Sequence, residues 1–332
     1  MATIYQVAAR AGVSPATVSR VMNGGRVSAE SERLVRAAAE ELSFTPNRTA
    51  RTLRTRQSDV IALIIPDIEN PFFTALARGV EDRARAAGYS VVLCNTDDDS
   101  ARESTYVDIV LAEQMAGVIL APADGDGDVG RLITGGRPVV AVDRSPHGVH
   151  IDAVTVDNRA GGRFAAESLF AAGFSRVACI TGPNRVETAQ LRLQGWQEAA
   201  RARGADHQEL LRYANYRVDG GRAAMADLLA LPQPPDAAVV ANNLMAVGAL
   251  DALREAGLDP PGFGLAVFGD LPYASLRRPG VSVVPLPARE LGDTAAGLLL
   301  DRIAGAAGPA RTVVLRTDGP AADGGQVTEG NR

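Results

Sequence analysis

The sequence contains few of the residues that form metal sites or disulfides, and it lacks the long apolar run of a membrane span. Its 332 residues include two cysteines and three histidines, and none of them has the short spacing that a zinc site requires. Cys94 and Cys179 each lie within an apolar run, which favours buried free thiols over a disulfide. No apolar run reaches about 18 residues, the length of a transmembrane helix, and the first residues lack the layout of a signal peptide. We therefore expect a cytoplasmic chain that carries no metal and no other cofactor.

The motifs of several enzyme classes are also missing. An NAD-dependent enzyme needs a G-x-G-x-x-G motif after a strand, and Gly161-Gly162 opens no such motif. We find no acid, base or nucleophile with the spacing of a sugar kinase or hydrolase. Lysine is absent as well, since all 34 basic residues are arginine, which we attribute to genomic base composition. The sequence therefore predicts a protein that is not an enzyme.

The length and composition indicate about two globular domains. Hydrophobic residues make up 46% and charged residues 22%, as in an ordinary soluble protein. Charge is unevenly distributed: residues 1–58 contain nine arginines and four glutamates, a formal charge of +5. Because the whole chain has a net charge of −5, the remainder carries −10. A basic segment on an acidic body is typical of a DNA-binding head attached to another domain.

The head begins with a pattern of two short helices joined by a turn. Thr3 and Gln6 have the spacing of a capping box, and Gly12 allows the tight turn. Ser14 is a good N-cap for the next helix, with Pro15 at its first position. A third helix would begin after Ser28 and turn four apolar side chains inward. These are Leu34, Val35, Ala38 and Leu42.

The second of these helices has one face suited to the DNA major groove. Val18, Val21 and Met22 form an apolar stripe, so the opposite face carries the groove-facing candidates. These are Ala16, Thr17, Ser19, Arg20 and Asn23. Arginine can bind guanine as a fork, and an alanine methyl can contact a thymine methyl. The alternative is a small three-helix bundle without a nucleic-acid role.

The body, from residue 59 onward, alternates strand and helix patterns. Continuous apolar strands separated by helices are typical of parallel sheets covered on both faces. The predicted strands span 60–65, 90–95, 117–121, 138–142, 154–157, 176–181, 236–241, 264–268, 281–284 and 312–315. The pattern starts again near residue 158, which indicates two doubly wound subdomains with a ligand cleft between their strand ends.

Several segments resemble the lac repressor family of bacterial transcription regulators. They are "TIYQVAARAGVSPATVSRVMNG", "FTPNRTARTLRT", "VIALIIPDIENPFFTALARGVEDRARAAGYSVVLCNTD" and "VTVDNRAGGRFAAESLFAAGFSRVACITGP". The resemblance implies an all-α helix-turn-helix head on an α/β, periplasmic-binding-protein-like body. It also implies a homodimer that binds palindromic operator DNA and is controlled by a small-molecule effector, a sugar or a related metabolite. With the groove-facing candidates, it gives as DNA-binding residues Tyr5, Ser14, Asn47, Arg51 and Leu53.

The domain boundaries follow from the pattern and the resemblance together. We expect a DNA-binding domain over 1–45, a hinge over 46–58 and an effector-binding domain over 59–316. Within the last, one subdomain takes 59–157 and 286–308, the other takes 158–285 and 309–316, and 317–332 form a disordered tail. In the family, the hinge is a short helix that folds on operator DNA, where Leu53 would wedge between base pairs. The alternative is a flexible linker whose Leu53 packs on its own body.

Residues that follow the predicted strands are the candidates for effector binding. Aromatic rings can stack on a sugar, and arginine, asparagine and aspartate can bind its hydroxyls. The resemblance selects Phe72, Phe73, Asp157, Arg192, Tyr216, Asn243 and Asp270. Trp196 matches a position of core packing and is not selected.

The sequence departs from the family at two cleft positions, where "ND" reads Asn242-Asn243 and "GFDD" reads "FGDL". An effector with several hydroxyls, such as a sugar, fits these residues, and a nucleoside stays open. The alternative function is a solute-binding protein or a sugar-processing protein without a DNA role, although a solute-binding protein needs an export signal and no basic head.

Overall fold

The structure is a computed structural model that describes residues 2–22, 25–44, 58–123, 127–146, 148–204, 208–270, 280–317 and 327–328. The chain forms two compact units, a head of residues Met1–Ser58 and a body of residues Asp59–Arg332. None of the described helices is long and apolar enough to cross a membrane.

The head is a bundle of three helices, α1 (Ile4–Ala11), α2 (Pro15–Met22) and α3 (Ala29–Glu41). The predicted capping box is present at Thr3, and Gly12 ends α1 with a φ of 66°, a conformation that glycine adopts without strain. Ser14 accepts a hydrogen bond from the Thr17 amide at 3.1 Å, so α2 begins where the sequence predicts. The core contains Val7, Val18 and Val35, each fully buried.

One prediction for the head is wrong. Leu34 is 39% exposed, although the apolar spacing placed it in the core. The inward face of α3 is made instead by Val35, Ala38 and Ala39. This face is centred on Val35, and Leu34 lies about 100° away from that centre around the helix, at the edge of the buried face.

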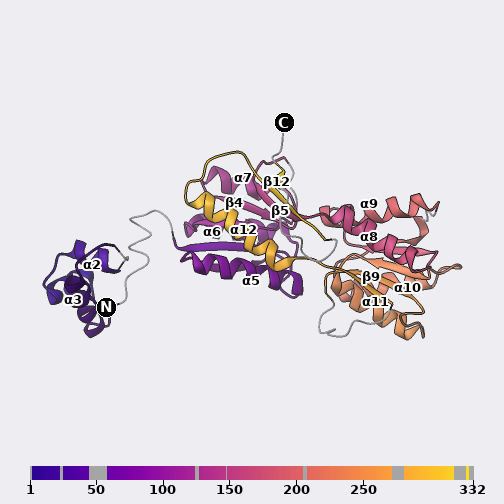
Figure 1. Ribbon diagram of the computed structural model, residues 1–332, viewed down its shortest axis with the longest axis horizontal. Coiled ribbons are helices and arrows are strands. Elements are labelled where there is room, and N and C mark those ends of the chain that lie inside the picture. The colour runs from indigo at the N-terminus through magenta and orange to yellow at the C-terminus, as the bar shows by residue number, and fades with distance from the viewer. Residues whose placement is uncertain are drawn as a thin grey trace. The chain divides into compact units, whose positions relative to one another are not determined.

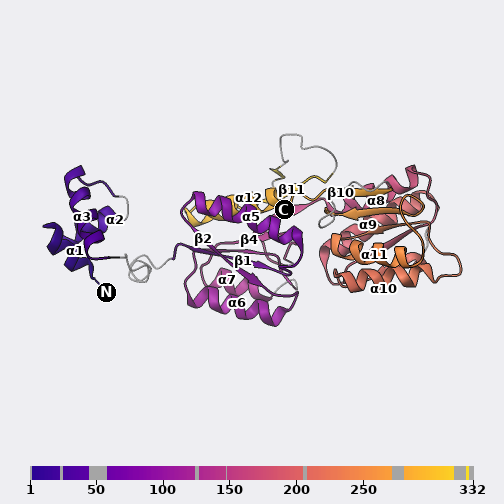
Figure 2. The same ribbon diagram turned by 90° about the horizontal axis from the view of Figure 1, so that it is seen from below.

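The first lobe of the body is built on a seven-stranded sheet with the order β12-β11-β5-β4-β3-β1-β2. Its strands are β1 (Val60–Ile65), β2 (Ser90–Asn95), β3 (Gly117–Leu120), β4 (Val139–Val142), β5 (Asp152–Val156), β11 (Thr312–Leu315) and β12 (Val327–Thr328). Helices α5 (Pro71–Ala86) and α12 (Ala288–Ile303) cover one face, and α6 (Ser100–Ala112) and α7 (Gly127–Thr134) cover the other (Figures 1 and 2). Alternate residues of β1 enter the two cores on either side of the sheet, which explains its unbroken apolar sequence.

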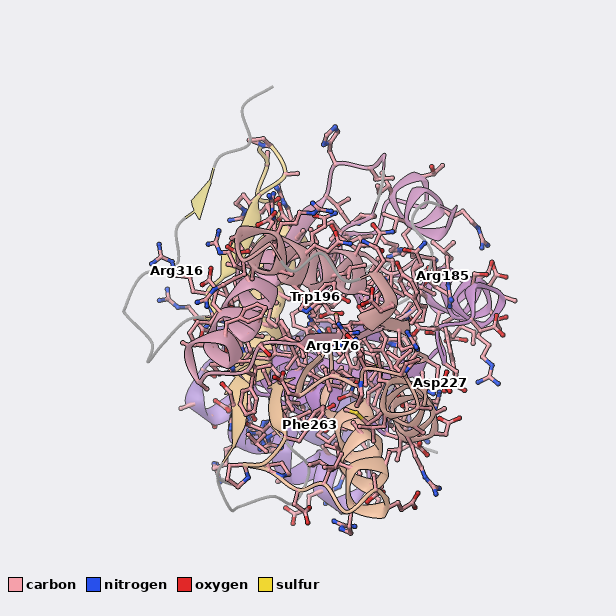
Figure 3. The ribbon with its side chains drawn as sticks, turned by 90° about the vertical axis from the view of Figure 1, so that its right-hand side faces the viewer. Arg176, Arg185, Trp196, Asp227, Phe263 and Arg316 are labelled. Carbon is pink, nitrogen blue, oxygen red and sulfur yellow. The ribbon has the colours of Figure 1, made fainter. Side chains whose placement is uncertain are left out.

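The second lobe is built on a five-stranded parallel sheet with the order β10-β9-β8-β6-β7. Its strands are β6 (Val177–Thr181), β7 (Leu211–Tyr213), β8 (Ala237–Val240), β9 (Gly264–Phe268) and β10 (Val281–Val284). Its helices are α8 (Asn158–Ala171), α9 (Glu187–Ala202), α10 (Val218–Leu229) and α11 (Asn243–Glu255), and the single turn Gln208–Leu210 is 3₁₀. Trp196 is a core residue of this lobe (Figure 3), and its indole nitrogen donates a hydrogen bond to the Val177 carbonyl at 3.2 Å.

The connectivity corrects the expected assignment of residues 309–316 to the second subdomain. β11 pairs in parallel with β5 of the first lobe, with Thr312 opposite Ala153 and Leu315 opposite Val156. The preceding α12 covers the first sheet, so the short connection after it returns the chain to that same sheet. Asp152 holds this connection, because its carboxylate accepts two hydrogen bonds of 2.8 Å from Arg302 and one of 2.7 Å from the Arg311 amide.

Two short strands were not predicted. β12 pairs antiparallel with β11, so Val327 and Thr328 belong to the sheet and not to a disordered tail. β7 has three residues with Arg212 at its centre, so no apolar run marks it in the sequence.

Three pairs of helices touch backbone to backbone through facing glycines. Gly79 and Gly292 lie where α5 crosses α12, Gly162 and Gly195 where α8 crosses α9, and Gly221 and Gly248 where α10 crosses α11. A Cβ at any of these six positions would collide with a backbone oxygen of the facing helix. Glycine is therefore required here by close approach, since all six lie inside helices, where glycine is otherwise unfavourable.

Candidate functional site

A cavity of about 260 Å³ lies in the body at the carboxyl ends of strands from both sheets. This is where parallel sheets place ligands, because the residues after each strand meet at that edge. First-lobe residues that line it include Asp67, Asn70, Phe72, Phe73, Asp97, Asp98, Asp143 and Arg144. Second-lobe residues include Arg185, Thr188, Arg192, Tyr216, Arg217, Asn242, Asn243 and Phe268.

Two phenylalanines form the aromatic wall of the first lobe. Asn70 caps α5 by accepting a hydrogen bond from the Phe72 amide at 3.0 Å, and Pro71 occupies the first helical position. This start of α5 directs Phe72 and Phe73 to the cavity, with ring centroids 5.0 Å apart and ring planes at 80°. Phe73 is 5% exposed and belongs also to the core, so Phe72 offers the more accessible ring.

Arg192 is the main cation contributed by the second lobe. Its Nε donates a hydrogen bond to Asn158 Oδ1 at 2.8 Å, and its Nη1 donates one to the Ala241 carbonyl at 2.5 Å. Its guanidinium carbon lies 4.5 Å from the centre of the Phe268 ring, a cation–π distance. Burial lowers the pKa of Arg192, but an arginine remains charged at neutral pH. These partners fix the guanidinium and leave other N–H donors for a ligand.

Sequence reasoning missed Asp143 and Arg144, which follow β4. Arg144 donates a hydrogen bond to Asp98 Oδ1 at 2.6 Å and another to the Pro122 carbonyl at 3.2 Å. The Asp143 carboxylate forms an ion pair with Arg144 Nε at 3.5 Å, and no hydrogen bond from a described residue holds it. The rule that selected residues after β1 and β8 would have found both side chains had it been applied after β4.

Burial acts in opposite directions on the pKa values of Asp143 and Arg144. Burial raises the pKa of Asp143, and the nearby charges of Arg144 and Arg192 only partly counter this. Burial alone would lower the pKa of Arg144, but Asp98 and Asp143 keep it above its ordinary value. Asp143 is therefore a buried carboxylate in an unfavourable environment, with free acceptor capacity directed at the cavity.

Tyr216 and two asparagines complete the second-lobe wall. Tyr216 has a φ of 62°, and its hydroxyl lies 3.2 Å from Thr188 Oγ1. Its ring covers Gly182, where a Cβ would collide with it. Asn242 caps α11 by accepting from the Met245 amide and also donates to the Tyr216 carbonyl, both at 2.8 Å. Asn243 lines the cavity and is 4% exposed.

Two selected residues lie elsewhere. Asp157 is exposed and caps α8, accepting a hydrogen bond from the Ala160 amide at 2.9 Å, and it is not among the lining residues. Asp270 is exposed too, and only its backbone carbonyl contacts Asn243 Nδ2, at 3.3 Å. Five of the seven selected residues therefore line one cavity. They are Phe72, Phe73, Arg192, Tyr216 and Asn243.

The head presents the predicted face of α2 to solvent. Ala16 and Arg20 are exposed, and Thr17 and Ser19 are half-buried beside them. Tyr5 is 72% exposed on α1, and Ser14 is exposed while it caps α2. The other DNA-binding candidates lie outside the described residues. They are Asn23, Asn47, Arg51 and Leu53.

These features define a class of protein: a helix-turn-helix head joined to a body with a ligand cavity between two parallel-sheet lobes. Residues 3–47 match the family "Bacterial regulatory proteins, lacI family". Residues 58–317 match "Periplasmic binding proteins and sugar binding domain of LacI family". Within the part of the chain that the structure describes, no group of three histidine, cysteine, aspartate or glutamate residues could hold a metal ion.

Known proteins of this class resemble the whole chain. The "Ribose operon repressor" of Escherichia coli K12 is 35% identical over 311 residues, covering 91% of this chain and 93% of that protein. The "HTH-type transcriptional repressor CytR" of the same organism is 32% identical and covers 92% and 90%.

Two solved structures extend the similarity to three dimensions. The lac repressor dimer bound to operator and the anti-inducer ONPF has a TM-score of 0.83 at 28% identity, covering 95% of this chain and 96% of that one. The complex of the transcriptional regulator CelR with cellobiose has a TM-score of 0.72 at 31% identity, covering 96% and 98%. The chain belongs to the lac repressor family, and it is a DNA-binding transcriptional repressor with a sugar-binding body.

Proposed function

We propose that the cavity binds a free monosaccharide, with a pentose such as ribose as the best fit, and that binding controls the operator affinity of the head. The observation that carries this proposal is one cavity that joins aromatic rings to hydrogen-bonding groups from both lobes. A sugar has apolar C–H faces that pack on Phe72. Its hydroxyls can donate to the Asp143 carboxylate and accept from Arg192.

The charge and size of the cavity narrow the ligand class. Four aspartates and four arginines line it, so their formal charges cancel, which favours a neutral ligand over a sugar phosphate. They are Asp67, Asp97, Asp98, Asp143, Arg144, Arg185, Arg192 and Arg217. The volume of about 260 Å³ is below the roughly 300–1,000 Å³ of pockets for drug-sized ligands. A monosaccharide therefore fits better than a disaccharide or a nucleoside, and the similarity to a ribose operon repressor supports a pentose.

The ligand can be identified with purified full-length protein. We expect D-ribose to raise the melting temperature in a saturable way, because a ligand that binds only the native state stabilises it. Glucose, cellobiose, cytidine and ribose 5-phosphate serve as comparison compounds. A response to cytidine alone would replace the sugar by a nucleoside, and a response to ribose 5-phosphate alone would contradict the charge argument. Ribose should be recovered unchanged, since we propose a sensor and not an enzyme.

For the head, we propose that two copies in a dimer read the two halves of a palindromic operator in the cytoplasm. Arg20, on the exposed face of α2, would enter the major groove. The variant Arg20→Ala should lose about 1–3 kcal/mol of preference for operator over random DNA, measured by gel shift at one fixed salt concentration. Arg36→Ala removes an exposed arginine that pairs with Glu32 on α3, and it should affect both DNAs alike. Equal discrimination by both variants would refute the assignment of Arg20.

For residues 46–58, we propose a hinge helix that folds on the operator and inserts Leu53 between base pairs. Leu53→Ala should then weaken operator binding without changing the melting temperature of the body. Addition of ribose should shift the operator affinity of the wild type. An unchanged operator affinity of Leu53→Ala would favour the flexible linker instead.

A further inference from the structure

The two lobes are joined across the cavity by polar contacts as well as by the chain. Arg217 of the second lobe lies 3.9 Å from Glu69 and 3.7 Å from Asp97 of the first. These distances are long, and Arg217 is 43% and Glu69 81% exposed, so solvent weakens both pairs. A third contact is different: the Ser145 amide donates a hydrogen bond of 2.6 Å to Glu187 Oε2 in a partly buried setting.

The position of Glu187 strengthens this hydrogen bond. Glu187 is the first residue of α9, and no side chain caps that end of the helix. A carboxylate at a helix N-terminus interacts favourably with the helix dipole. A hydrogen bond to a charged acceptor is stronger than a neutral one, and here it connects the second lobe to the backbone of the first.

Both ends of this contact are fixed within their own lobes. Ser145 follows Arg144, which is held by Asp98 and by the Pro122 carbonyl. On the other side, α9 packs on α8 at Gly195, where the backbones touch. The same two segments carry ligand groups, since Asp143 precedes Ser145 by two residues and Arg192 lies on α9. The Glu187 contact therefore joins directly the two segments that carry these ligand groups.

We propose that Glu187 is a positioning residue that ties the Asp143–Arg144 segment to α9 and so holds the lobes at the separation a ligand requires. Glu187 is not among the residues that line the cavity, and it acts through the backbone of Ser145. Without this contact, the lobes would spend more time apart, and a ligand would have to draw them together at the expense of its own affinity.

The lobe separation can be measured without any ligand. The substitutions Ile109→Cys on α6 and Leu258→Cys after α11 place spin labels on exposed positions, one in each lobe. The native Cys94 and Cys179 are buried, so they stay in place. We expect Glu187→Ala to broaden the distance distribution between the labels toward longer distances. Glu187→Gln keeps an oxygen acceptor of similar size, so it should retain most of the wild-type distribution.

The control is Glu198→Ala, which removes a glutamate from the same helix. Glu198 pairs with Arg159 inside the second lobe, so the label distances should not change. In ribose titrations, which rest on the proposed function, Glu187→Ala should weaken binding about tenfold or more, and Glu198→Ala should not. If ribose does not bind, the proposed function fails, but the distance measurement still tests Glu187. Identical distance distributions for Glu187→Ala and Glu198→Ala would overturn the proposal.

Discussion

Asp143→Asn should weaken ligand binding and leave the fold intact or more stable. The variant keeps the shape of the side chain and removes the negative charge. In the wild type, the buried carboxylate forms an ion pair with Arg144 at 3.5 Å, and in the proposed complex it would accept hydrogen bonds from a sugar. Hydrogen bonds to a charged group contribute about 1.5–3 kcal/mol, so ribose affinity should fall about 10- to 150-fold.

The same substitution has a second, independent signature in the pH dependence of stability. Burial raises the pKa of Asp143 in the folded protein, whereas the unfolded chain has the ordinary value of about 3.9. Between these two pKa values the folded state binds the proton more tightly, so the free energy of unfolding falls as pH rises through the window. Asparagine does not titrate. The stability of the variant relative to the wild type should therefore increase from pH 4 toward pH 7.

Calorimetric titration with ribose and urea unfolding at several pH values would measure both effects. Asp157→Asn is the matched control, because Asp157 is an exposed helix cap outside the cavity and asparagine caps equally well. It should leave the ribose affinity unchanged. If Asp143→Asn bound ribose as well as the wild type and lost stability relative to it as pH rose, the assigned role of Asp143 would be refuted.

Two further substitutions test the packing of the body. Asp152→Asn should lower the free energy of unfolding by about 3 kcal/mol, since it breaks a buried ion pair with Arg302. Urea unfolding would measure this loss. The control is Asp301→Asn at an exposed position, which should be almost neutral. Burial acts against the Asp152 charge, but hydrogen bonds from Arg302 and Arg311 lower its pKa below the ordinary value. The contribution of the Asp152 carboxylate to the free energy of unfolding is therefore lost as pH falls through that lowered pKa. An equal difference in the free energy of unfolding between wild type and Asp152→Asn at pH 7 and at pH 2 would contradict this. Gly248→Ala should destabilise by about 1–3 kcal/mol through collision with α10. Gly130→Ala, in open space on α7, should stabilise the protein slightly because alanine favours helix. Thermal melts would measure both variants, and shifts of the melting temperature with the same sign for the two would exclude the collision at Gly248.

The local structure was predictable where chemistry between neighbouring residues decides it. Thr3 with Gln6, Ser14 with Pro15, and Asn70 with Pro71 each mark a helix start that the structure contains. The apolar run of β1 predicts a strand buried on both faces, and the structure buries it so.

Features that depend on which distant segments meet were not predictable. The sequence of β11 is equally suited to either sheet, and its place is set by pairing with β5 and by the bonds of Asp152. The exposure of Leu34 depends on which face of α3 meets the other helices, and that face is centred on Val35. Asp157 looks the same in sequence as a ligand-binding aspartate, but its carboxylate is used by the start of α8.

The facing glycines constrain how the body can respond to an occupied cavity. Helices whose backbones are in contact can neither roll nor slide past each other, so each crossed pair and its sheet behave as one stiff plate. A change of shape must then be concentrated in the few residues where the chain passes between plates, near Asp157 and Pro287. A bound molecule would therefore tilt the first sheet and its helices as one body. The displacement would increase with distance from those pivots and would be largest at the far edge of the sheet.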